Sequence, residues 1–125
     1  AYGQLRQPPL SPPGGVFPVV WTVLYLLMGY AAYRIVTSKA DPRQLRSALT
    51  LYGLQLFFNG LWSPVFFGLQ WRLLAFFVLV VLWLFVLLTI RAFSEVSERA
   101  GDLLLPYLLW VTFAGYLNFG IYLLN

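Results

Sequence analysis

The sequence predicts an all-α fold, a polytopic transmembrane bundle of four helices that forms a single domain over residues 1–125. Its composition and the length of its uncharged runs predict this fold. Of the 125 residues, 61% are hydrophobic and only 10% are charged, whereas a soluble domain carries roughly 25% charged residues. Four stretches hold no Asp, Glu, Lys or Arg, and each is about as long as the ~20 residues that cross a bilayer; they are 7–33, 47–71, 73–90 and 103–125. Four spans and their turns occupy nearly the whole chain, which leaves no room for a soluble domain.

The first helix follows a segment rich in proline and glycine, residues 1–16, which cannot be helical throughout and is expected to be a loop. We predict this helix over about 17–36, with Pro18 in the first turn, where its missing N–H costs little. A polar connection, 37–46, follows, and its Asp-Pro pair is typical of a turn.

The other three helices are predicted from their apolar runs. The second covers about 47–68, with a kink expected around Gly60. A tight turn leads to the third helix, about 73–93, and a charged connection, 94–102, leads to the fourth, about 103–124. These boundaries complete the four-helix prediction.

The distribution of basic residues predicts the topology. One end of the spans collects six bases, namely Arg34, Lys39, Arg43, Arg46, Arg91 and Arg99. The other end has only Arg6 and Arg72. The positive-inside rule therefore places the connections 37–46 and 94–102 in the cytoplasm, with both chain ends on the opposite side.

The residue types that are absent exclude much chemistry. The chain has no Cys and no His, which excludes disulfides and thiolate chemistry and removes the commonest metal ligand and general base. No conventional catalytic constellation is left, and no metal site is expected. The acidic residues, Asp41, Glu95, Glu98 and Asp102, all lie between the spans. The chain therefore lacks the intramembrane carboxylate that ion-coupled transport normally needs.

Polar side chains on three of the helices predict an interior. An amide such as Asn59 that faced lipid would leave its polar atoms unsatisfied, so it should face protein or a ligand. The third helix is apolar all round, and we expect it to be peripheral. Helices one, two and four would then enclose an aromatic, uncharged cavity lined by Trp21, Tyr25, Asn59, Trp62, Trp110, Ala114 and Asn118. Such a cavity suits a flat, largely apolar ligand with some polar edge groups.

Each of these residues also has a plainer structural interpretation. Trp21 lies near a helix end, where tryptophan is enriched as an interfacial anchor. Trp62 and Trp110 can serve helix packing, and Asn59 and Asn118 can bond between helices, worth ~0.6 kcal/mol on average in membranes. The opposite face of the second helix carries Gly53, Phe57 and Gly60, which indicates close helix packing, and we predict a homodimer interface there.

Three segments together resemble one membrane-protein family. They are PPGGVFPVVWTVLYLLMGYAAY (12–33), QLFFNGLWSPVFFGLQ (55–70) and PYLLWVTFAGYLNFGIYLLN (106–125). The chain resembles the TspO/translocator protein family over nearly its whole length and in the family's order. Members are also called tryptophan-rich sensory proteins or peripheral-type benzodiazepine receptors.

The resemblance implies a five-helix membrane protein, usually a homodimer, that binds porphyrins such as protoporphyrin IX. Some members bind cholesterol or isoquinoline-type ligands, and certain bacterial members are implicated in light-dependent porphyrin breakdown. Carried over position by position, the resemblance assigns ligand contacts to Tyr2, Trp21, Asn59, Trp110 and Ala114. It assigns a photochemical role to Trp21 and Trp110.

The sequence departs from the family pattern at three points. The family has a further helix before the loop that holds Tyr2, so we expect this chain to be an N-terminally shortened form. Ala1 and Leu10 stand where the family loop often has tryptophan. The family's C-terminal sterol motif needs a base soon after a tyrosine, and no base follows Arg99, so sterol recognition by that motif is not expected.

The leading hypothesis is a membrane receptor or sensor that binds a porphyrin, with light-dependent porphyrin degradation as a further activity. No cofactor is required, and a metal-free porphyrin is favoured over haem, because only Met28 and the tyrosines could hold iron. The alternative is a passive transporter of porphyrin or sterol-like lipids. An enzyme that degrades porphyrin and a purely structural helical partner are the other two possibilities, and no nucleic-acid partner is expected.

Overall fold

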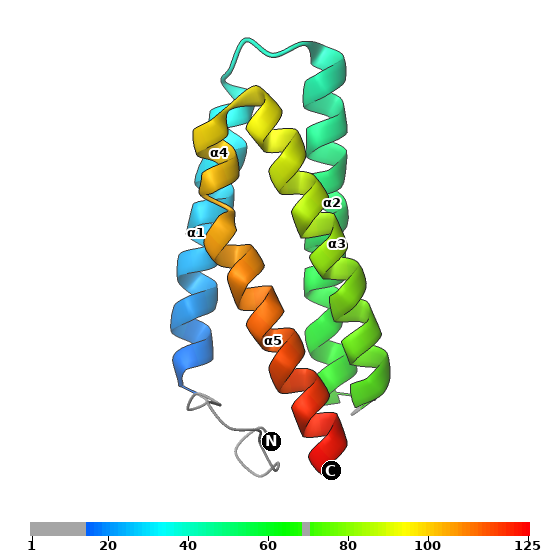
Figure 1. Cartoon of the computed structure of the whole chain (residues 1–125). Helices are drawn as coiled ribbons and strands as arrows, with labels where there is room; N and C mark the ends of the chain where they lie inside the picture. Colours follow the sequence, from blue (N-terminus) through cyan, green and yellow to red (C-terminus); the bar gives the residue numbers. More distant parts are fainter. Residues whose placement is uncertain (1–14, 69–70) are drawn as a thin grey trace.

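The computed structural model describes residues 15–68 and 71–125. Within these residues the chain is helical and contains no strand. The helices, in order, are α1 (Val16–Val36), α2 (Pro42–Ser63), the π-helix η2 (Pro64–Gly68), α3 (Arg72–Val96), α4 (Glu98–Asp102) and α5 (Leu105–Leu124). The four long helices run side by side in one elongated bundle (Figure 1). The predicted all-α bundle is confirmed.

The first helix begins and ends almost where the sequence predicts. α1 starts one residue early, at Val16, and holds Pro18 in its first turn. It ends at Val36, and the backbone N–H and side-chain hydroxyl of the C-cap residue Thr37 both donate to the carbonyl oxygen of Tyr33, at 3.0 and 2.8 Å. These bonds satisfy a carbonyl that the end of a helix would otherwise leave free.

The second helix begins five residues earlier than predicted. Asp41 is its N-cap, since the Asp41 carboxylate accepts a bond from the backbone N–H of Arg43 at 3.0 Å, and Pro42 occupies the first turn. The Asp-Pro pair thus starts a helix and does not form the predicted turn. The regular helix continues through Gly60, and the irregular segment η2 begins at Pro64. A proline cannot donate the i to i−4 hydrogen bond, so the irregularity lies there and not at the predicted kink.

The charged segment 94–102 is mostly helical and not the predicted open connection. α3 continues to Val96, and Ser97 then caps the short α4 by accepting a bond from the backbone N–H of Ala100 at 3.3 Å. The turn is tight, because a Cβ on Gly101 would overlap Ser94 Oγ and lie 3.1 Å from the carbonyl oxygen of Ile90. α5 then begins at Leu105, two residues later than predicted.

The third helix is central, and the prediction that it is peripheral was wrong. α3 packs along both α2 and α5 and also contacts α1 and α4. It buries a row of apolar residues, and two of its rings, Phe85 and Phe93, stack on Phe58 and Tyr52 of α2 at centroid distances of 5.5 and 5.7 Å. An all-apolar helix is equally compatible with lipid and with protein, so its pattern alone could not decide its place.

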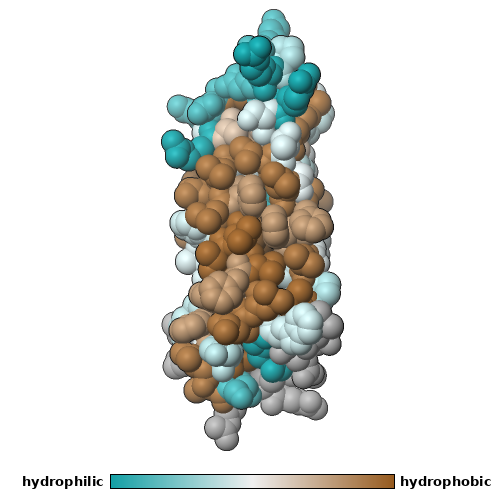
Figure 2. All heavy atoms as spheres, turned by 90° about the vertical axis from the view of Figure 1, so that its right-hand side faces the viewer, coloured by the Kyte–Doolittle hydropathy of each residue, from teal (hydrophilic) through white to brown (hydrophobic). Residues whose placement is uncertain are grey.

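The bundle has the surface of a membrane protein. Three helical segments are long and apolar enough to cross a bilayer: α1, α3 and residues 98–124. α2 is equally long but more polar, because it carries Arg43 and Arg46 near its start and amides on its inner face. Figure 2 shows a hydrophobic band over the middle of the α2–α3 side, with hydrophilic residues gathered at the upper end.

The two ends of the bundle differ as the topology prediction requires. The 37–41 connection and α4 lie at one end, and the start of α1 and the C-terminus lie at the other (Figure 1). The assignment of the first end to the cytoplasm rests on the positive-inside rule and stays a prediction.

Candidate ligand-binding site

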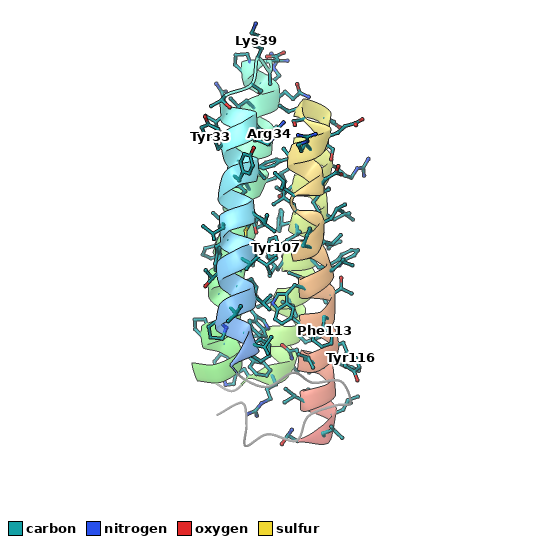
Figure 3. The ribbon with its side chains drawn as sticks, turned by 90° about the vertical axis from the view of Figure 1, so that its left-hand side faces the viewer. Tyr33, Arg34, Lys39, Tyr107, Phe113 and Tyr116 are labelled. Carbon is teal, nitrogen blue, oxygen red and sulfur yellow. The ribbon has the colours of Figure 1, made fainter. Side chains whose placement is uncertain are left out.

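A buried chain of hydrogen bonds joins α1, α2 and α5 in the middle of the bundle. The Tyr107 hydroxyl of α5 donates to Gln55 Oε1 at 2.6 Å and accepts from Asn59 Nδ2 at 2.7 Å. The Asn59 Oδ1 atom accepts a bond from the Tyr25 hydroxyl of α1, and Gln55 Nε2 lies 3.9 Å from the sulfur of Met28. We call these five side chains the Tyr107 network. Figure 3 shows Tyr107 at mid-height between the helices.

Helical spacing accounts for the Tyr107 network. Gln55 and Asn59 are four residues apart on α2, so both amides face the same way, and Tyr25 and Met28 are three apart on α1. The amides are buried, as the polar-face argument predicted. The network's centre, Tyr107, was missed as a site residue. Tyr107 could have been found from its chemistry, because a phenol buried in a membrane needs a hydrogen-bond partner, and the facing amides can supply one.

A second polar chain lies nearer the C-terminal end of the bundle. The Trp62 indole N–H donates to Asn118 Oδ1 at 2.8 Å, and Asn118 Nδ2 donates to the carbonyl oxygen of Arg72 at 2.8 Å. This chain ties the end of α2 to α5 and to the start of α3. Trp62 and Asn118 are therefore brought together, but as a pair separate from the Tyr107 network.

Aromatic rings cluster beside the Tyr107 network, where α1 faces α5. The Trp21 ring lies 5.7 Å from that of Tyr25, 6.2 Å from that of Tyr107 and 6.3 Å from that of Trp110, centroid to centroid. Phe17 meets Trp110 at 5.6 Å. The Trp110 Nε1 atom is buried and, among the described residues, has no hydrogen-bond partner. A buried N–H without an acceptor is costly in any protein, so an acceptor that reached this atom would stabilise the structure.

A cavity of about 440 Å³ opens between α1 and α5 and has Trp110 in its wall. Its other walls are apolar and include Val20, Val23 and Leu27 of α1 and Leu109 and Phe113 of α5. Its size falls within the ~300–1,000 Å³ range of small-molecule sites. We call it the α1–α5 cavity.

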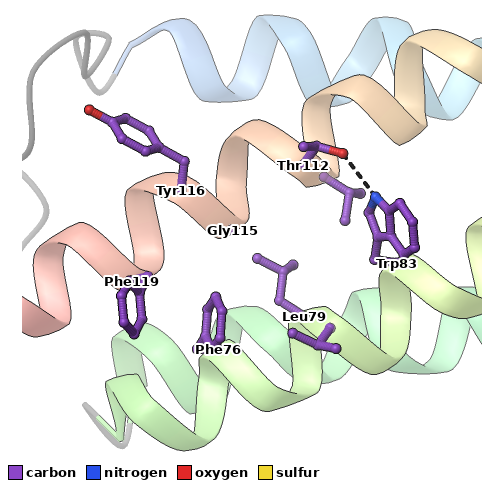
Figure 4. A pocket seen from close by; sticks show the side chains of 9 residues that line it. Phe76, Leu79, Trp83, Thr112, Gly115, Tyr116 and Phe119 are labelled. Atoms are coloured by element: carbon purple, nitrogen blue, oxygen red, sulfur yellow. Dashed lines mark hydrogen bonds between the residues drawn. The ribbon is translucent and has the colours of Figure 1, made fainter.

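A second cavity, of about 360 Å³, lies between α3 and α5 (Figure 4). Its walls include Phe76, Leu79, Gly115 and Phe119, and at one end the Trp83 indole N–H donates to the Thr112 hydroxyl at 2.9 Å. Thr112 in turn donates to the carbonyl oxygen of Leu108 at 2.8 Å. Because the polar groups of Trp83 and Thr112 already bond one another, this pair offers no free donor to orient a ligand in the otherwise largely apolar cavity.

The chain matches the model of the TspO/MBR family over residues 1–124. It is 42% identical to the "Tryptophan-rich protein TspO" of Chlorobaculum tepidum, over 99% of this chain and 78% of that protein. It is 44% identical to the "Tryptophan-rich sensory protein" of Cereibacter sphaeroides, over 99% of this chain and 76% of that protein. The chain belongs to the TspO/MBR family. The "Translocator protein" of Bos taurus is a more distant relative, 36% identical over 94% of this chain and 70% of that protein.

Membership in the TspO/MBR family confirms the resemblance seen in the sequence. Together with the long apolar helices, it shows that the chain is an integral membrane protein. The TspO/MBR family includes proteins named as sensors and proteins named as translocators, so family membership alone does not distinguish between these activities.

The residues that the TspO/MBR resemblance assigns to a ligand lie in two places. Trp21 and Trp110 meet in the aromatic cluster, and Asn59 lies in the adjoining Tyr107 network. Ala114 is buried on α5, one helical turn beyond Trp110. Tyr2 lies outside the described residues.

Within residues 15–68 and 71–125, the face predicted for dimerisation is exposed. Phe57 is 62% exposed, and a Cβ added at Gly53 or at Gly60 would meet no atom within 4 Å. The amides of α2 point the other way, into the Tyr107 network. The two faces of α2 are therefore as different as the sequence predicts.

Proposed function

We propose that this protein is a membrane receptor or sensor that binds protoporphyrin IX-like tetrapyrroles beside Trp21 and Trp110. One observation carries the proposal: Trp110 lines the α1–α5 cavity, its ring meets that of Trp21, and its N–H has no acceptor among the residues that the structure describes. A porphyrin is flat, largely apolar and edged by carboxylates. Its ring would pack against the apolar walls, and an edge oxygen would accept from Trp110.

A ligand that binds the Asn59 amide must first break a hydrogen bond of the Tyr107 network. Both polar atoms of the Asn59 amide are already bonded, one to Tyr25 and one to Tyr107. Tyr25 is 46% exposed, so it is the more accessible of the two partners. We propose that a ligand which uses the Asn59 amide does so by displacing the Tyr25 hydroxyl, while Tyr107 keeps its bond to Gln55.

The same placement supports a photochemical activity. A porphyrin excited by light can oxidise a nearby indole or form reactive oxygen beside it, and we propose Trp21 and Trp110 as the residues involved. In the aromatic cluster, the ring centroids of these two indoles are 6.3 Å apart. Passive transport of porphyrin or sterol-like lipids remains the alternative, and uptake by liposomes that carry the protein distinguishes transport from binding.

We also propose a homodimer that packs through Gly53, Phe57 and Gly60. This face is exposed, apolar and open at both glycines. Small residues allow two helix backbones to approach closely, which is how helices associate in lipid. The face lies on the side of α2 opposite the Tyr107 network, so dimerisation would leave the porphyrin site accessible from α1.

Titration of the detergent-solubilised protein with protoporphyrin IX, followed by the porphyrin absorption band, tests the binding proposal. Trp110→Phe keeps the aromatic bulk and removes the N–H, and it should weaken binding about tenfold, the worth of one hydrogen bond to a charged carboxylate of ~1.5 kcal/mol. Trp83→Phe is the matched control, because its indole already bonds Thr112 in the other cavity. Equal affinities of wild type and both variants would contradict a site at Trp110.

A further inference from the structure

Arg72 lies at the start of α3, where none of the residues that the structure describes pairs with its charge. Its Nε atom is buried and has no hydrogen-bond partner among those residues. No ion pair to Arg72 is found in the part of the chain that the structure describes. The guanidinium lies over the Phe66 ring, whose centroid is 5.9 Å from Cζ. A cation–π contact of this kind offsets only part of the cost of removing a guanidinium from water.

The charge pattern of the sequence leaves this end of the bundle without acidic side chains. Asp41 lies in the connection that precedes α2, and Glu95, Glu98 and Asp102 lie in or beside α4. Both segments are at the end of the bundle opposite Arg72 (Figure 1). An acidic side chain cannot reach across the length of α3 to neutralise Arg72, so the half-buried guanidinium can pair with an anion from outside the chain.

A cavity of about 310 Å³ adjoins Arg72 and has the lining expected at a bilayer surface. Trp71 and Tyr122 stand in its walls, 56% and 40% exposed, together with Leu73, Leu74 and the polar Asn125. Tryptophan and tyrosine concentrate where lipid headgroups begin. The two leucines continue the wall along α3, toward the depth of the acyl chains.

We propose that Arg72 and this cavity bind the phosphate of an anionic membrane phospholipid. A guanidinium presents its donors in a planar fork that matches two phosphate oxygens, and it is less strongly hydrated than an ammonium group. The exposed aromatic rings flank the headgroup, and an acyl chain lies along Leu73 and Leu74. The apolar walls favour a lipid phosphate over a soluble one. This site is distinct from the proposed porphyrin site, since it shares no residue with the α1–α5 cavity.

Native mass spectrometry of the purified full chain with phosphatidylglycerol or phosphatidylcholine tests the proposal. Both lipids carry the phosphate, but the choline cation of phosphatidylcholine offsets its charge, so wild type should bind one phosphatidylglycerol roughly tenfold more tightly than phosphatidylcholine. Arg72→Gln should lose this preference, and Arg72→Lys should keep part of it. Arg43→Gln, which removes an exposed base at the other end of the bundle, should leave it unchanged.

Three further outcomes would overturn the proposal. Equal affinity of wild type for the two lipids would show that Arg72 does not select an anionic phospholipid. An unchanged preference in an Arg72→Gln protein that melts at the wild-type temperature would place the lipid elsewhere. Protection against thermal unfolding by inorganic phosphate equal to that by phosphatidylglycerol would indicate a soluble anion.

A porphyrin titration separates this site from the proposed function. Arg72→Gln should bind protoporphyrin IX with wild-type affinity while it loses the phosphatidylglycerol preference. If instead the porphyrin affinity falls and the lipid preference stays, Arg72 serves the porphyrin carboxylates and the lipid site is refuted. Because wild type alone decides the comparison of the two lipids, the test does not depend on the folding of any variant.

Discussion

The Trp21 and Trp110 rings meet edge to face, with centroids 6.3 Å apart and planes at 87°. Such a pair contributes about 0.5–1.5 kcal/mol beyond the area that it buries. It links the first turns of α1 to the first half of α5 across 89 residues of chain, next to a cavity that both helices line. This contact places the two most oxidisable side chains of the region beside one candidate ligand volume.

If a bound porphyrin uses these indoles photochemically, replacing either by phenylalanine should affect breakdown far more than binding. Trp21→Phe and Trp110→Phe retain an aromatic ring, so the affinity should fall by less than the ~1–3 kcal/mol typical of losing a stacking aromatic. The rate of porphyrin loss under illumination at saturating ligand should fall much further. Trp83→Phe serves as the control. Equal rates in all four proteins would mean that the tryptophans only shape the cavity.

The Tyr107 hydroxyl should be worth more to stability than an exposed phenol. Tyr107→Phe leaves Gln55 Oε1 and Asn59 Nδ2 buried without their partner. Interhelical bonds in membranes average only ~0.6 kcal/mol, but each orphaned buried group costs about 1–3 kcal/mol. We therefore expect a loss of about 1–3 kcal/mol in the free energy of unfolding in detergent. Tyr122→Phe, at an exposed ring, should change it by less than about 0.5 kcal/mol.

The proposed displacement of Tyr25 makes two substitutions act in opposite directions. Asn59→Leu removes the amide and should weaken protoporphyrin IX binding by roughly 1–3 kcal/mol. Tyr25→Phe removes the hydroxyl that occupies Asn59 Oδ1 and should leave binding unchanged or tighter. Titration of both variants at equal detergent concentration measures this. Weaker binding in Tyr25→Phe, or wild-type affinity in a folded Asn59→Leu, would return Asn59 to a purely structural role.

Gly60 should matter for assembly and not for the fold of one chain. Because a Cβ at Gly60 meets no atom within 4 Å, Gly60→Leu should leave the protomer folded and disrupt the proposed dimer. Gly29→Leu on α1 is the matched control, since that glycine is equally open. Crosslinking in membranes should give dimers for wild type and Gly29→Leu and mainly monomers for Gly60→Leu. A dimer that survives Gly60→Leu excludes this face.

The helices and the inward amides could be predicted from the sequence because a bilayer imposes strict requirements on both. Uncharged runs must be long enough to span it, and amides such as Gln55 and Asn59 must find partners. Both requirements are local and can be counted from residue spacing. The first helix was therefore predicted to within one residue, and the buried face of α2 was predicted correctly.

The parts that the sequence could not predict depend on which surfaces meet. α3 is apolar on every side, so neither its central place nor its stacking on α2 could follow from its pattern. In the sequence, Tyr107 does not differ from the other aromatic residues of the membrane helices. Its role is evident only from its hydrogen bonds with the amides of Gln55 and Asn59. Asp41-Pro42 fits a turn and a helix start equally well, and only the bond from Arg43 to the Asp41 carboxylate decides.

The most direct test of the central claim is an experimental structure of the protein with protoporphyrin IX bound. We predict that the macrocycle contacts both Trp21 and Trp110, with one of its oxygens within hydrogen-bond distance of Trp110 Nε1. A macrocycle in the α3–α5 cavity beside Trp83, with Trp21 and Trp110 still packed on each other and free of ligand, would contradict it.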